Sequence, residues 1–453
     1  MGFLFMLFVI AEVSLLAITF IKQKENVQWL RNRVLVRVGE IVLFFVALLL
    51  PQVAWDFRFK ICFYMLVIRV VTALWGYALK HKKVMGNKSK PGAVVNAVVG
   101  ILVLMISLVP AVLFTGYEGL ETTGDYKVKQ TSAILVDESR VESFETDGSK
   151  REIPVHFYYP QTENAGENSF PLVVFSHGAF GYYQSNTSTY MELASHGYVV
   201  ISLDHPYHSF FTEDTEGKTI TVNPNFMQEV MYINQDGTPE EEIFELSSKW
   251  LAIRTADINF VLDCVEQAKA EKDCQAEWFM ESEEDEKVIL EVLAMTDVNK
   301  IGLMGHSLGG AASVTVGRQR EGIDAVIDLD GTMLGEQLSY ENGSYQYYEE
   351  AYPIPLLSMD NEEHYLDGDT IDALYVNNVV LENAIDSKHT YFVGSGHMNF
   401  TDLPLFSPIL SSLLGTGTID ETECVMTMNE IILQYFNDYL KGEGEVIINE
   451  CYG

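Results

Sequence analysis

Basic residues are scarce in this chain, and their scarcity excludes one large class of proteins. The 453 residues include 29 Lys and Arg against 64 Asp and Glu, for a formal net charge of −35. A chain of this sign repels the phosphate backbone, which argues against a nucleic-acid-binding protein. Internal repeats and low-complexity tracts are also missing, while 48% of the residues are hydrophobic and 12% aromatic. This composition is not that of a disordered protein.

The charge is divided unevenly along the chain. Residues 1–116 hold 13 basic and 4 acidic side chains, whereas residues 117–453 hold 16 basic and 60 acidic ones. The first segment is very apolar, and the second is long enough for one large domain. We therefore expect two domains, a transmembrane region over 1–116 and an acidic folded domain over 117–453.

Apolar runs in the first segment predict membrane-spanning helices. Each run approaches or exceeds the roughly 20 residues that a helix needs to cross a bilayer. The chain opens into the first run without the basic start of a signal peptide, and three more runs follow. We expect four spans, at about residues 3–21, 38–55, 61–79 and 93–115.

Basic residues in the connections between these runs predict the orientation, because connections rich in Lys and Arg stay in the cytoplasm. The second connection is poor in them. The first and third are rich, with Lys22, Lys24, Arg31, Arg33 and Arg37 in one and Lys80, Lys82, Lys83, Lys88 and Lys90 in the other. We expect a multi-pass protein of the cell membrane whose N-terminus and acidic domain are extracellular.

Two ionisable residues lie inside the predicted spans. Glu12 and Arg69 are near the middle of the first and third spans, where an unpaired charge is costly. We expect these two side chains to face each other.

Cysteine usage agrees with an exported domain. An even set of four cysteines after residue 116 predicts disulfides, by local pairing 264–274 and 424–451. Other pairings and free thiols remain open. The four residues are Cys264, Cys274, Cys424 and Cys451.

The acidic domain has the pattern of an α/β protein. Short continuous apolar runs alternate with helical stretches, which predicts a buried, mostly parallel sheet. We expect strands at about 152–159, 171–176, 198–204, 300–304, 325–330, 355–359 and 390–394. We expect helices at about 187–195, 245–270, 277–294, 308–319, 371–384 and 424–441.

The sharpest motif is GHSLGG at 305–310, which fits the pattern GxSxG between a strand and a helix. A nucleophile elbow needs a serine at a tight strand-to-helix turn, and glycines two residues before and after it avoid collisions with neighbouring elements. Gly305 and Gly309 supply these glycines. We predict that Ser307 is a catalytic nucleophile.

Two backbone N–H groups are expected to form an oxyanion hole near Ser307. One belongs to the residue after the nucleophile, Leu308, and the other to a loop after an earlier strand. SHGAFG at 176–181 follows such a strand, and we predict Ala179 as the second donor.

The general base must follow Ser307 in the order Ser, acid, His, which leaves three histidines. His389 lies at the start of its predicted strand, the wrong end of a parallel sheet. His364 lies in an acidic loop, where we expect it to be solvated. His397 follows the strand at the carboxyl end, where an active site forms, and is the predicted base.

The acid is harder to assign from the residues. Asp330 ends one predicted strand and Asp360 ends the next, and both reach the same edge of the sheet. Asp328 lies deeper in its strand and is a weaker candidate. Reasoning from position alone leaves Asp330 and Asp360 nearly tied.

Several segments of the domain resemble a known family. PLVVFSHG at 171–178, LASHGY at 193–198, GHSLGG at 305–310, the LD pair ending at 330 and HMNFTD at 397–402 are similar to the platelet-activating-factor acetylhydrolases of the plasma and intracellular type II group. The resemblance covers about 150–440. It implies an α/β-hydrolase fold, with Asp330 as the acid, His397 as the base, and Ala179 and Leu308 as oxyanion donors.

This resemblance also implies a substrate class. Family members cleave short or oxidised sn-2 acyl chains from phospholipids through an acyl-enzyme, so we expect a serine esterase on lipid esters that needs no metal and no cofactor. Leu308 replaces the phenylalanine of the animal proteins, and Gly331 replaces a tryptophan-bearing stretch, so selectivity is not carried over. A general carboxylesterase, or a membrane receptor with a non-catalytic hydrolase domain, remains the alternative.

Two further segments contain residue types that occur in functional sites. HPYH at 205–208 offers two imidazoles, but without a third ligand nearby we expect the rim of the pocket rather than a metal site. The long connection over 207–242 carries apolar residues that suit either a lid or core packing. The sequence does not predict an oligomeric state.

Overall fold

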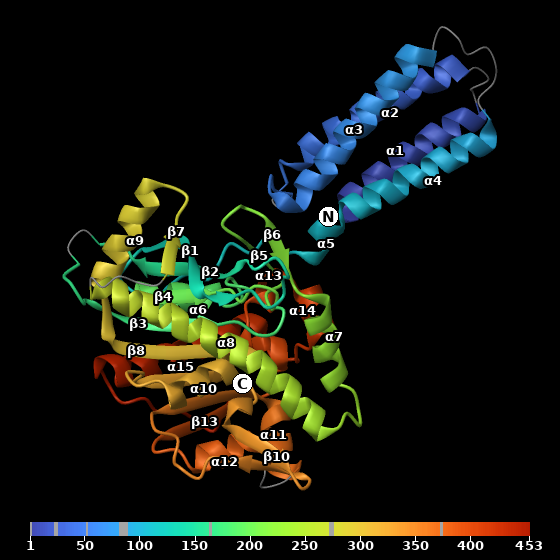
Figure 1. Cartoon of the computed structure of the whole chain (residues 1–453). Coiled ribbons are helices and arrows are strands. Elements are labelled where there is room, and N and C mark those ends of the chain that lie inside the picture. The colour runs from blue at the N-terminus through green and yellow to red at the C-terminus, as the bar shows by residue number, and fades with distance from the viewer. Residues whose placement is uncertain are drawn as a thin grey trace. The chain divides into compact units, whose positions relative to one another are not determined.

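The computed structural model describes residues 2–21, 26–50, 53–80, 89–162, 165–270, 276–371 and 375–453. The chain divides into two compact units (Figure 1). One comprises Met1–Glu118 with Leu405–Leu410, and the other comprises Gly119–Pro404 with Ser411–Gly453.

Helices make up the first unit. Contacts join α1 to α2 and α4, and α3 to α2 and α4, so the four long helices form a bundle (Figure 1). Its core contains Phe8, Phe44, Phe59, Leu66 and Leu104. The helices are α1 (Gly2–Ile21), α2 (Asn26–Ala47), α3 (Phe57–Lys80), α4 (Lys90–Ser107) and α5 (Val109–Leu113).

The number of apolar helices differs from the prediction of four spans. Within the described residues, three helices are long and apolar enough to cross a membrane: Gly2–Ile21, Phe57–Leu79 and Lys90–Ser107. The second predicted span, 38–55, is not one helix, because α2 ends at Ala47. This helix begins earlier and includes arginines that were expected in a connection. Lys22, Lys24, Lys82, Lys83 and Lys88 lie outside the described residues.

The predicted contact between Glu12 and Arg69 is present as a buried ion pair. Two charges of α2 extend it, since Arg37 lies 2.7 Å from Glu12 and 2.9 Å from Glu40. A Cβ at Gly100 of α4 would overlap the Glu12 carboxylate. The two acids and two arginines of this buried cluster therefore come from α1, α2 and α3, and α4 packs against them at Gly100.

A large sheet forms the centre of the second unit. Within the described residues, ten strands run in the order β14-β13-β12-β9-β8-β3-β4-β2-β1-β7. Pairing is parallel from β14 to β4 and antiparallel from there to β7. The strands are β1 (Val128–Val141), β2 (Lys150–Pro160), β3 (Phe170–Ser176), β4 (Val199–Leu203), β7 (Ala276–Phe279), β8 (Thr296–His306), β9 (Ala325–Leu329), β12 (Leu356–Asn361), β13 (Ser387–Phe392) and β14 (Cys451–Tyr452).

Helices cover both faces of this sheet. Leu303 of β8 packs in the same core as Ile258 and Val261 of α8, whereas a Cβ at the adjacent Gly302 would contact Phe436 of α15. Successive strand residues point to opposite faces, so α8 and α15 lie on opposite sides. The helices after residue 118 are α6 (Thr187–Ser195), α7 (Pro224–Ile233), α8 (Glu240–Lys269), α9 (Glu283–Met295), α10 (Leu308–Gln319), α11 (Glu362–Ile371), α12 (Val376–Glu382), α13 (Leu403–Phe406), α14 (Pro408–Leu414) and α15 (Glu421–Phe436).

Short elements complete the described chain. Two hairpins stand apart from the large sheet, β5 (Phe211–Glu213) with β6 (Thr219–Thr221) and β10 (Gln337–Glu341) with β11 (Ser344–Tyr347). One-turn segments are η1 (Leu334–Glu336), η2 (His397–Phe400) and η3 (Asn437–Lys441). The segment η2 follows β13 and carries the predicted base.

The predicted 424–451 disulfide is wrong, because both thiols are free. Cys424 is buried in the first turn of α15, and its thiol lies 3.8 Å from the carbonyl of Asn399. Cys451 is exposed in β14 at the edge of the sheet, where it pairs with Tyr391 of β13. The other predicted disulfide involves Cys274, which lies outside the described residues.

Candidate active site

Ser307 lies at a strained turn between β8 and α10. Its φ of 55° and ψ of −124° are unusual for a residue with a side chain, and such strain persists only where surrounding structure enforces it. A Cβ at Gly305 would overlap Gly309, and one at Gly309 would overlap the Ser176 carbonyl. The two glycines of the motif are therefore required by close backbone approaches.

Asp330 and His397 are hydrogen-bonded at the same edge of the sheet. Asp330 follows β9, the neighbour of β8, and His397 Nδ1 lies 2.6 Å from Asp330 Oδ2. A Cβ at Gly331 would come within 2.7 Å of the Ser307 carbonyl oxygen. His306, the residue before the serine, lies 3.1 Å through Nε2 from the His397 carbonyl oxygen. These contacts bring all three predicted residues into one site.

The geometry also fixes the direction of the imidazole. Since a carboxylate accepts hydrogen bonds, His397 Nδ1 carries the proton toward Asp330 and Nε2 is left as the acceptor. Among the described residues, no hydrogen bond joins Ser307 Oγ to His397. Such bonds are often long before substrate binds.

Two residues that sequence reasoning missed hold the Asp330 carboxylate. Asn361 donates to it from its backbone N at 2.7 Å and from Nδ2 at 2.7 and 2.9 Å. His364 Nδ1 lies 2.9 Å from Asp330 Oδ1, so the prediction that His364 is a solvated loop residue is wrong. Asn361 is the last residue of β12 and His364 lies in the first turn of α11, and the predicted strand end near Asp360 was the only signal for them in the sequence.

Hydrogen bonding decides the charge of Asp330. Burial alone would raise its pKa, but the hydrogen bonds from His364 and His397 outweigh burial and hold the pKa well below its ordinary value. The hydrogen bond to Asp330 raises the pKa of His364 to about 9, against the opposing effect of burial. At neutral pH the site therefore holds a carboxylate beside a protonated His364.

Neither of the other two aspartates contacts His397 in the described structure. Asp360 Oδ2 is paired with His389 Nε2 at 2.6 Å. Asp328 is fully buried below α10, and burial followed by repulsion from Asp360 raises its pKa well above the ordinary value. The hydrogen bonds thus favour Asp330 over Asp360 as the partner of His397, a choice that their positions in the sequence left open.

The loop after β3 approaches Ser307 closely. A Cβ at Gly178 would lie 3.3 Å from Ser307 Cβ and 2.7 Å from His306 Nδ1. In the described structure the N–H of Ala179 has no backbone acceptor, and the N–H of Leu308, first in α10, lacks a partner within its helix. Both predicted donors are free to bind a ligand oxygen.

Asp330, His364 and His397 also have the residue types of a metal site. Their ligand atoms lie within 4.8 Å of one another. The carboxylate, however, already accepts bonds from Asn361 and both imidazoles on its two oxygens. Its acceptor positions are occupied, so this arrangement suits hydrogen bonding better than metal binding.

The prediction that HPYH at 205–208 forms the pocket rim is wrong, because both histidines are fully buried. His205 lies between Asp257 and Ser176, 2.9 Å from each. His208 stacks on Phe226, with 3.8 Å between ring centroids. Burial, with a smaller effect of Arg254, lowers the pKa of His205 to about 4.

The long connection after His208 combines core packing with exposed apolar residues. Phe226 of α7 is buried in the core. Phe210 and Met231 remain 60% and 62% exposed. One part of the segment therefore packs in the core, and another part stays available for a lid.

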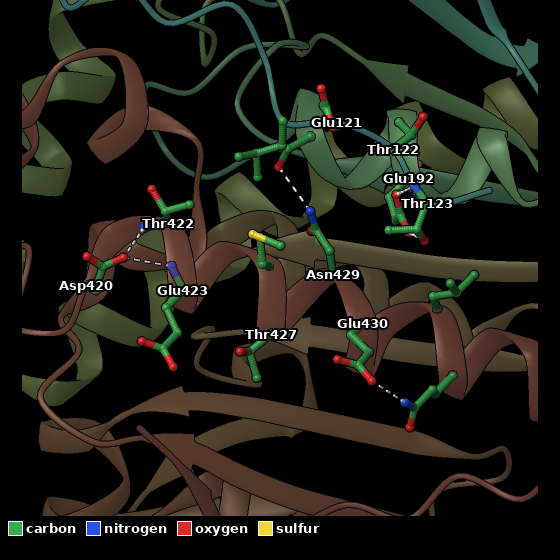
Figure 2. A pocket seen from close by; sticks show the side chains of 15 residues that line it. Glu121, Thr122, Thr123, Glu192, Asp420, Thr422, Glu423, Thr427, Asn429 and Glu430 are labelled. Carbon is green, nitrogen blue, oxygen red and sulfur yellow. Dashed lines mark hydrogen bonds between the residues drawn. The ribbon is translucent and has the colours of Figure 1, made fainter.

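A cavity of about 760 Å³ lies elsewhere in this unit, between residues 120–123, α6 and α15 (Figure 2). None of the predicted site residues lines it. Acidic side chains are frequent around it, with Glu121, Glu192, Asp420, Glu423 and Glu430 among the lining residues.

The fold and the site define a class. A strained serine follows a central parallel strand, and an aspartate hydrogen-bonded to a histidine lies at the same sheet edge, in a mostly parallel sheet covered by helices. The fold is shared with the solved structure of a ferulic acid esterase from Streptomyces cinnamoneus, with a TM-score of 0.53 and 20% sequence identity over 73% of this chain and 95% of that one. The second unit is thus an α/β protein with the fold of an esterase.

Within that class, the chain belongs to the family described as platelet-activating factor acetylhydrolase, isoform II, whose pattern matches residues 149–447. A probable 1-alkyl-2-acetylglycerophosphocholine esterase of Arthroderma benhamiae is 26% identical over 40% of this chain and 36% of its own length. The platelet-activating factor acetylhydrolase of Cavia porcellus is 22% identical over 60% of this chain and 58% of its own. The matched regions therefore span about a third to three-fifths of these relatives.

Proposed function

We propose that this chain is a membrane-anchored serine esterase of the α/β-hydrolase fold. Ser307 is the nucleophile, His397 the general base and Asp330 the acid. The observation that carries the proposal is the 2.6 Å hydrogen bond between Asp330 and His397 beside the strained Ser307 turn.

The reaction follows from the hydrogen-bond directions. His397 Nε2 takes the proton of Ser307 Oγ as this oxygen attacks the ester carbonyl carbon, and Asp330 stabilises the imidazolium that forms. The N–H groups of Ala179 and Leu308 bind the developing oxyanion. His397 then gives the proton to the leaving alcohol, and water, activated by the same residue, hydrolyses the acyl-enzyme. These steps require no metal or cofactor.

We further propose phospholipids with short or oxidised sn-2 chains as substrates, cleaved to a lysophospholipid and a short acid. Family membership supports this class, as does the similarity to the probable 1-alkyl-2-acetylglycerophosphocholine esterase of A. benhamiae. The acidic composition of residues 117–453, with 60 acidic against 16 basic side chains, favours a zwitterionic over an anionic headgroup.

The anchor in this proposal is a four-span bundle with the hydrolase unit outside the cell. Helix α2 would be the fourth span, and the pairing of its Arg37 and Glu40 inside the bundle supports that role despite the two charges. The arginines expected in the first connection lie in α2, so it is the lysines of the first and third connections that support a cytoplasmic location for these two connections.

The test is turnover by the full-length protein in detergent. We expect hydrolysis of 1-alkyl-2-acetylglycerophosphocholine to exceed that of a long-chain phosphatidylcholine. Ser307→Ala should reduce kcat by roughly 10⁶-fold. Asp330→Asn should reduce it by about 10⁴-fold, whereas the matched Asp360→Asn should stay within threefold. Loss of activity only in Asp360→Asn would contradict the assignment of the acid.

A general carboxylesterase is the second candidate, supported by the structural similarity to a ferulic acid esterase. Comparison of p-nitrophenyl acetate with the acetylated phospholipid separates the two. Faster turnover of the soluble ester, with no effect of lipid, would favour the second candidate. A folded protein without activity on any ester would indicate a non-catalytic receptor or scaffold.

A further inference from the structure

A fully buried arginine lies beneath the loop that carries Ala179. Arg254 is on α8 and has no exposed surface. It donates to the carbonyl oxygen of His177, and its Nη2 lies 3.2 Å from the carbonyl oxygen of Gly178. A buried guanidinium is costly unless it is hydrogen-bonded, so these contacts tie α8 to the loop.

The carbonyl of Gly178 is held by three donors at once. Besides Arg254, His177 Nδ1 lies 2.7 Å from it and the backbone N of Gly181 lies 3.1 Å from it. In a trans peptide the C=O of one residue and the N–H of the next point in opposite directions. Fixing the Gly178 carbonyl toward Arg254 of α8 therefore directs the N–H of Ala179 away from α8, in a loop that approaches Ser307 at Gly178.

The protonation state of His177 agrees with this arrangement. Its Nδ1 faces a carbonyl oxygen and must carry the hydrogen, while Nε2 is left as the acceptor, 2.8 Å from Ser209 Oγ and 3.3 Å from the backbone N of His205. Burial and the nearby Arg254 lower the pKa of His177 well below its ordinary value, so the ring is neutral. Burial lowers the pKa of Arg254 to about 9, which leaves it cationic at neutral pH.

A second chain of hydrogen bonds supports the start of the loop. Asp257, one turn after Arg254 on α8, lies 2.7 Å from Arg151 and 2.9 Å from His205, which lies 2.9 Å from Ser176 Oγ. Ser176, His205 and Asp257 have the connectivity of a catalytic triad, yet all three are at most 1% exposed. This burial separates them from substrate, and their hydrogen bonds connect the end of β3, where the loop begins, to α8.

We propose that Arg254 is a positioning residue that holds the Gly178–Ala179 peptide in the orientation of an oxyanion donor. It touches no reacting atom and acts through the N–H of Ala179. This inference rests on the proposed esterase function and adds a residue to it that lies about 50 positions before the nucleophile in the sequence.

The test compares an ester with its thionoester in the full-length protein. A thiocarbonyl sulfur is a weak hydrogen-bond acceptor, so the ratio of kcat/KM for p-nitrophenyl acetate over p-nitrophenyl thionoacetate reports the oxyanion hole. We expect Arg254→Gln to lower kcat on the acetate by about 10²- to 10³-fold with KM within threefold. The ratio should fall about tenfold, and Arg254→Lys should give intermediate values.

A matched control is available on the same helix interface. Arg320 pairs with Asp263 at 2.7 Å and Glu266 at 2.8 Å, both on α8, but not with the loop. Arg320→Gln should leave both the ratio and kcat within threefold of wild type. If Arg254→Gln does not fold, the ratio in Arg254→Lys decides.

Two results would overturn the inference. One is an unchanged kcat in a folded Arg254 variant, and the other is an equal loss on both substrates with an unchanged ratio, which a structural role alone would produce. The proposed esterase function fails separately, if wild type is inactive or Ser307→Ala retains turnover. The two failures are therefore distinguishable.

Discussion

At the scale of single residues, the carboxylate of Asp330 accepts hydrogen bonds from several residues of the site. Its two oxygens accept from His397, His364 and Asn361. The charged groups that act on His364 are Asp330, Asp360 and Glu363. A protonated His364 compensates part of the Asp330 charge, so it links the stability of this corner of the fold to pH.

We expect a pH-dependent loss of stability from His364→Gln. The pKa of His364 is raised from 6.5 to about 9, so the folded protein keeps a proton that the unfolded chain releases. This stabilisation is fully present below pH 6.5 and is lost as the pH rises through 9. Melting temperatures of wild type and variant should differ most near pH 6 and converge near pH 10. A constant difference across this range would contradict the assigned hydrogen bond.

Some residues of the candidate site could be predicted from the sequence and others could not. The structure places Ser307, Asp330 and His397 at one edge of the sheet. The GxSxG motif and the strand ends indicated Ser307 and His397, whereas only the family resemblance singled out Asp330. The sequence could not decide between Asp330 and Asp360 as the acid, because the decision depends on a contact in the fold: Asp360 pairs with His389. Arg254 could not be found, since a single arginine within a long helical pattern has no signal for burial.

At the scale of secondary-structure elements, local sequence patterns predicted the boundaries of several helices. They failed where a segment pairs with a strand that is distant in the sequence. Helices α6 (Thr187–Ser195) and α10 (Leu308–Gln319) begin and end where the sequence predicted. The helix predicted at 277–294 begins at Glu283, because 276–279 form β7, an edge strand paired with β1. Helix α11 was missed, since its acidic sequence resembles a loop.

In the bundle of α1 to α4, Glu12 of α1 and Arg69 of α3 form a buried ion pair. Removal of one partner from a buried ion pair leaves an uncompensated charge and costs about 3–5 kcal/mol in soluble proteins. Glu12→Leu or Arg69→Leu alone should therefore lower the yield and melting temperature of the detergent-solubilised protein.

The double variant Glu12→Leu/Arg69→Leu should recover much of that loss. It removes one acid and one base and leaves the Arg37–Glu40 pair, whose atoms lie 2.9 Å apart. Asp56→Asn is a suitable control, since Asp56 pairs locally with Arg58 and lies outside the cluster. A double variant that is as unstable as the sum of the single ones would contradict direct pairing.

At the scale of the whole molecule, the net charge of −35 is a sum over two unlike parts. The basic, apolar first 116 residues predict the topology, and the acidic remainder contains the candidate site. The fold class was predictable because a mostly parallel sheet leaves a repeated pattern of apolar strands and helices. The helical unit was predicted less well, because α2 combines a long helix with charges that resemble a connection.

Cys451 offers a direct test of the proposed orientation. It is exposed, whereas Cys62, Cys264 and Cys424 are buried. In a Cys274→Ser background, a membrane-impermeant maleimide should label Cys451 on intact cells, and Cys451→Ser should abolish the label. Labelling that requires permeabilised cells would place the hydrolase unit in the cytoplasm and contradict the proposed topology.

The most direct test of the central claim is covalent labelling of the full-length protein by a fluorophosphonate, with the adduct located by mass spectrometry. We expect one adduct on Ser307 in wild type, none in Ser307→Ala, and much slower labelling in His397→Gln. Folded wild-type protein that forms no adduct, or an adduct that persists in Ser307→Ala, would contradict Ser307 as the nucleophile.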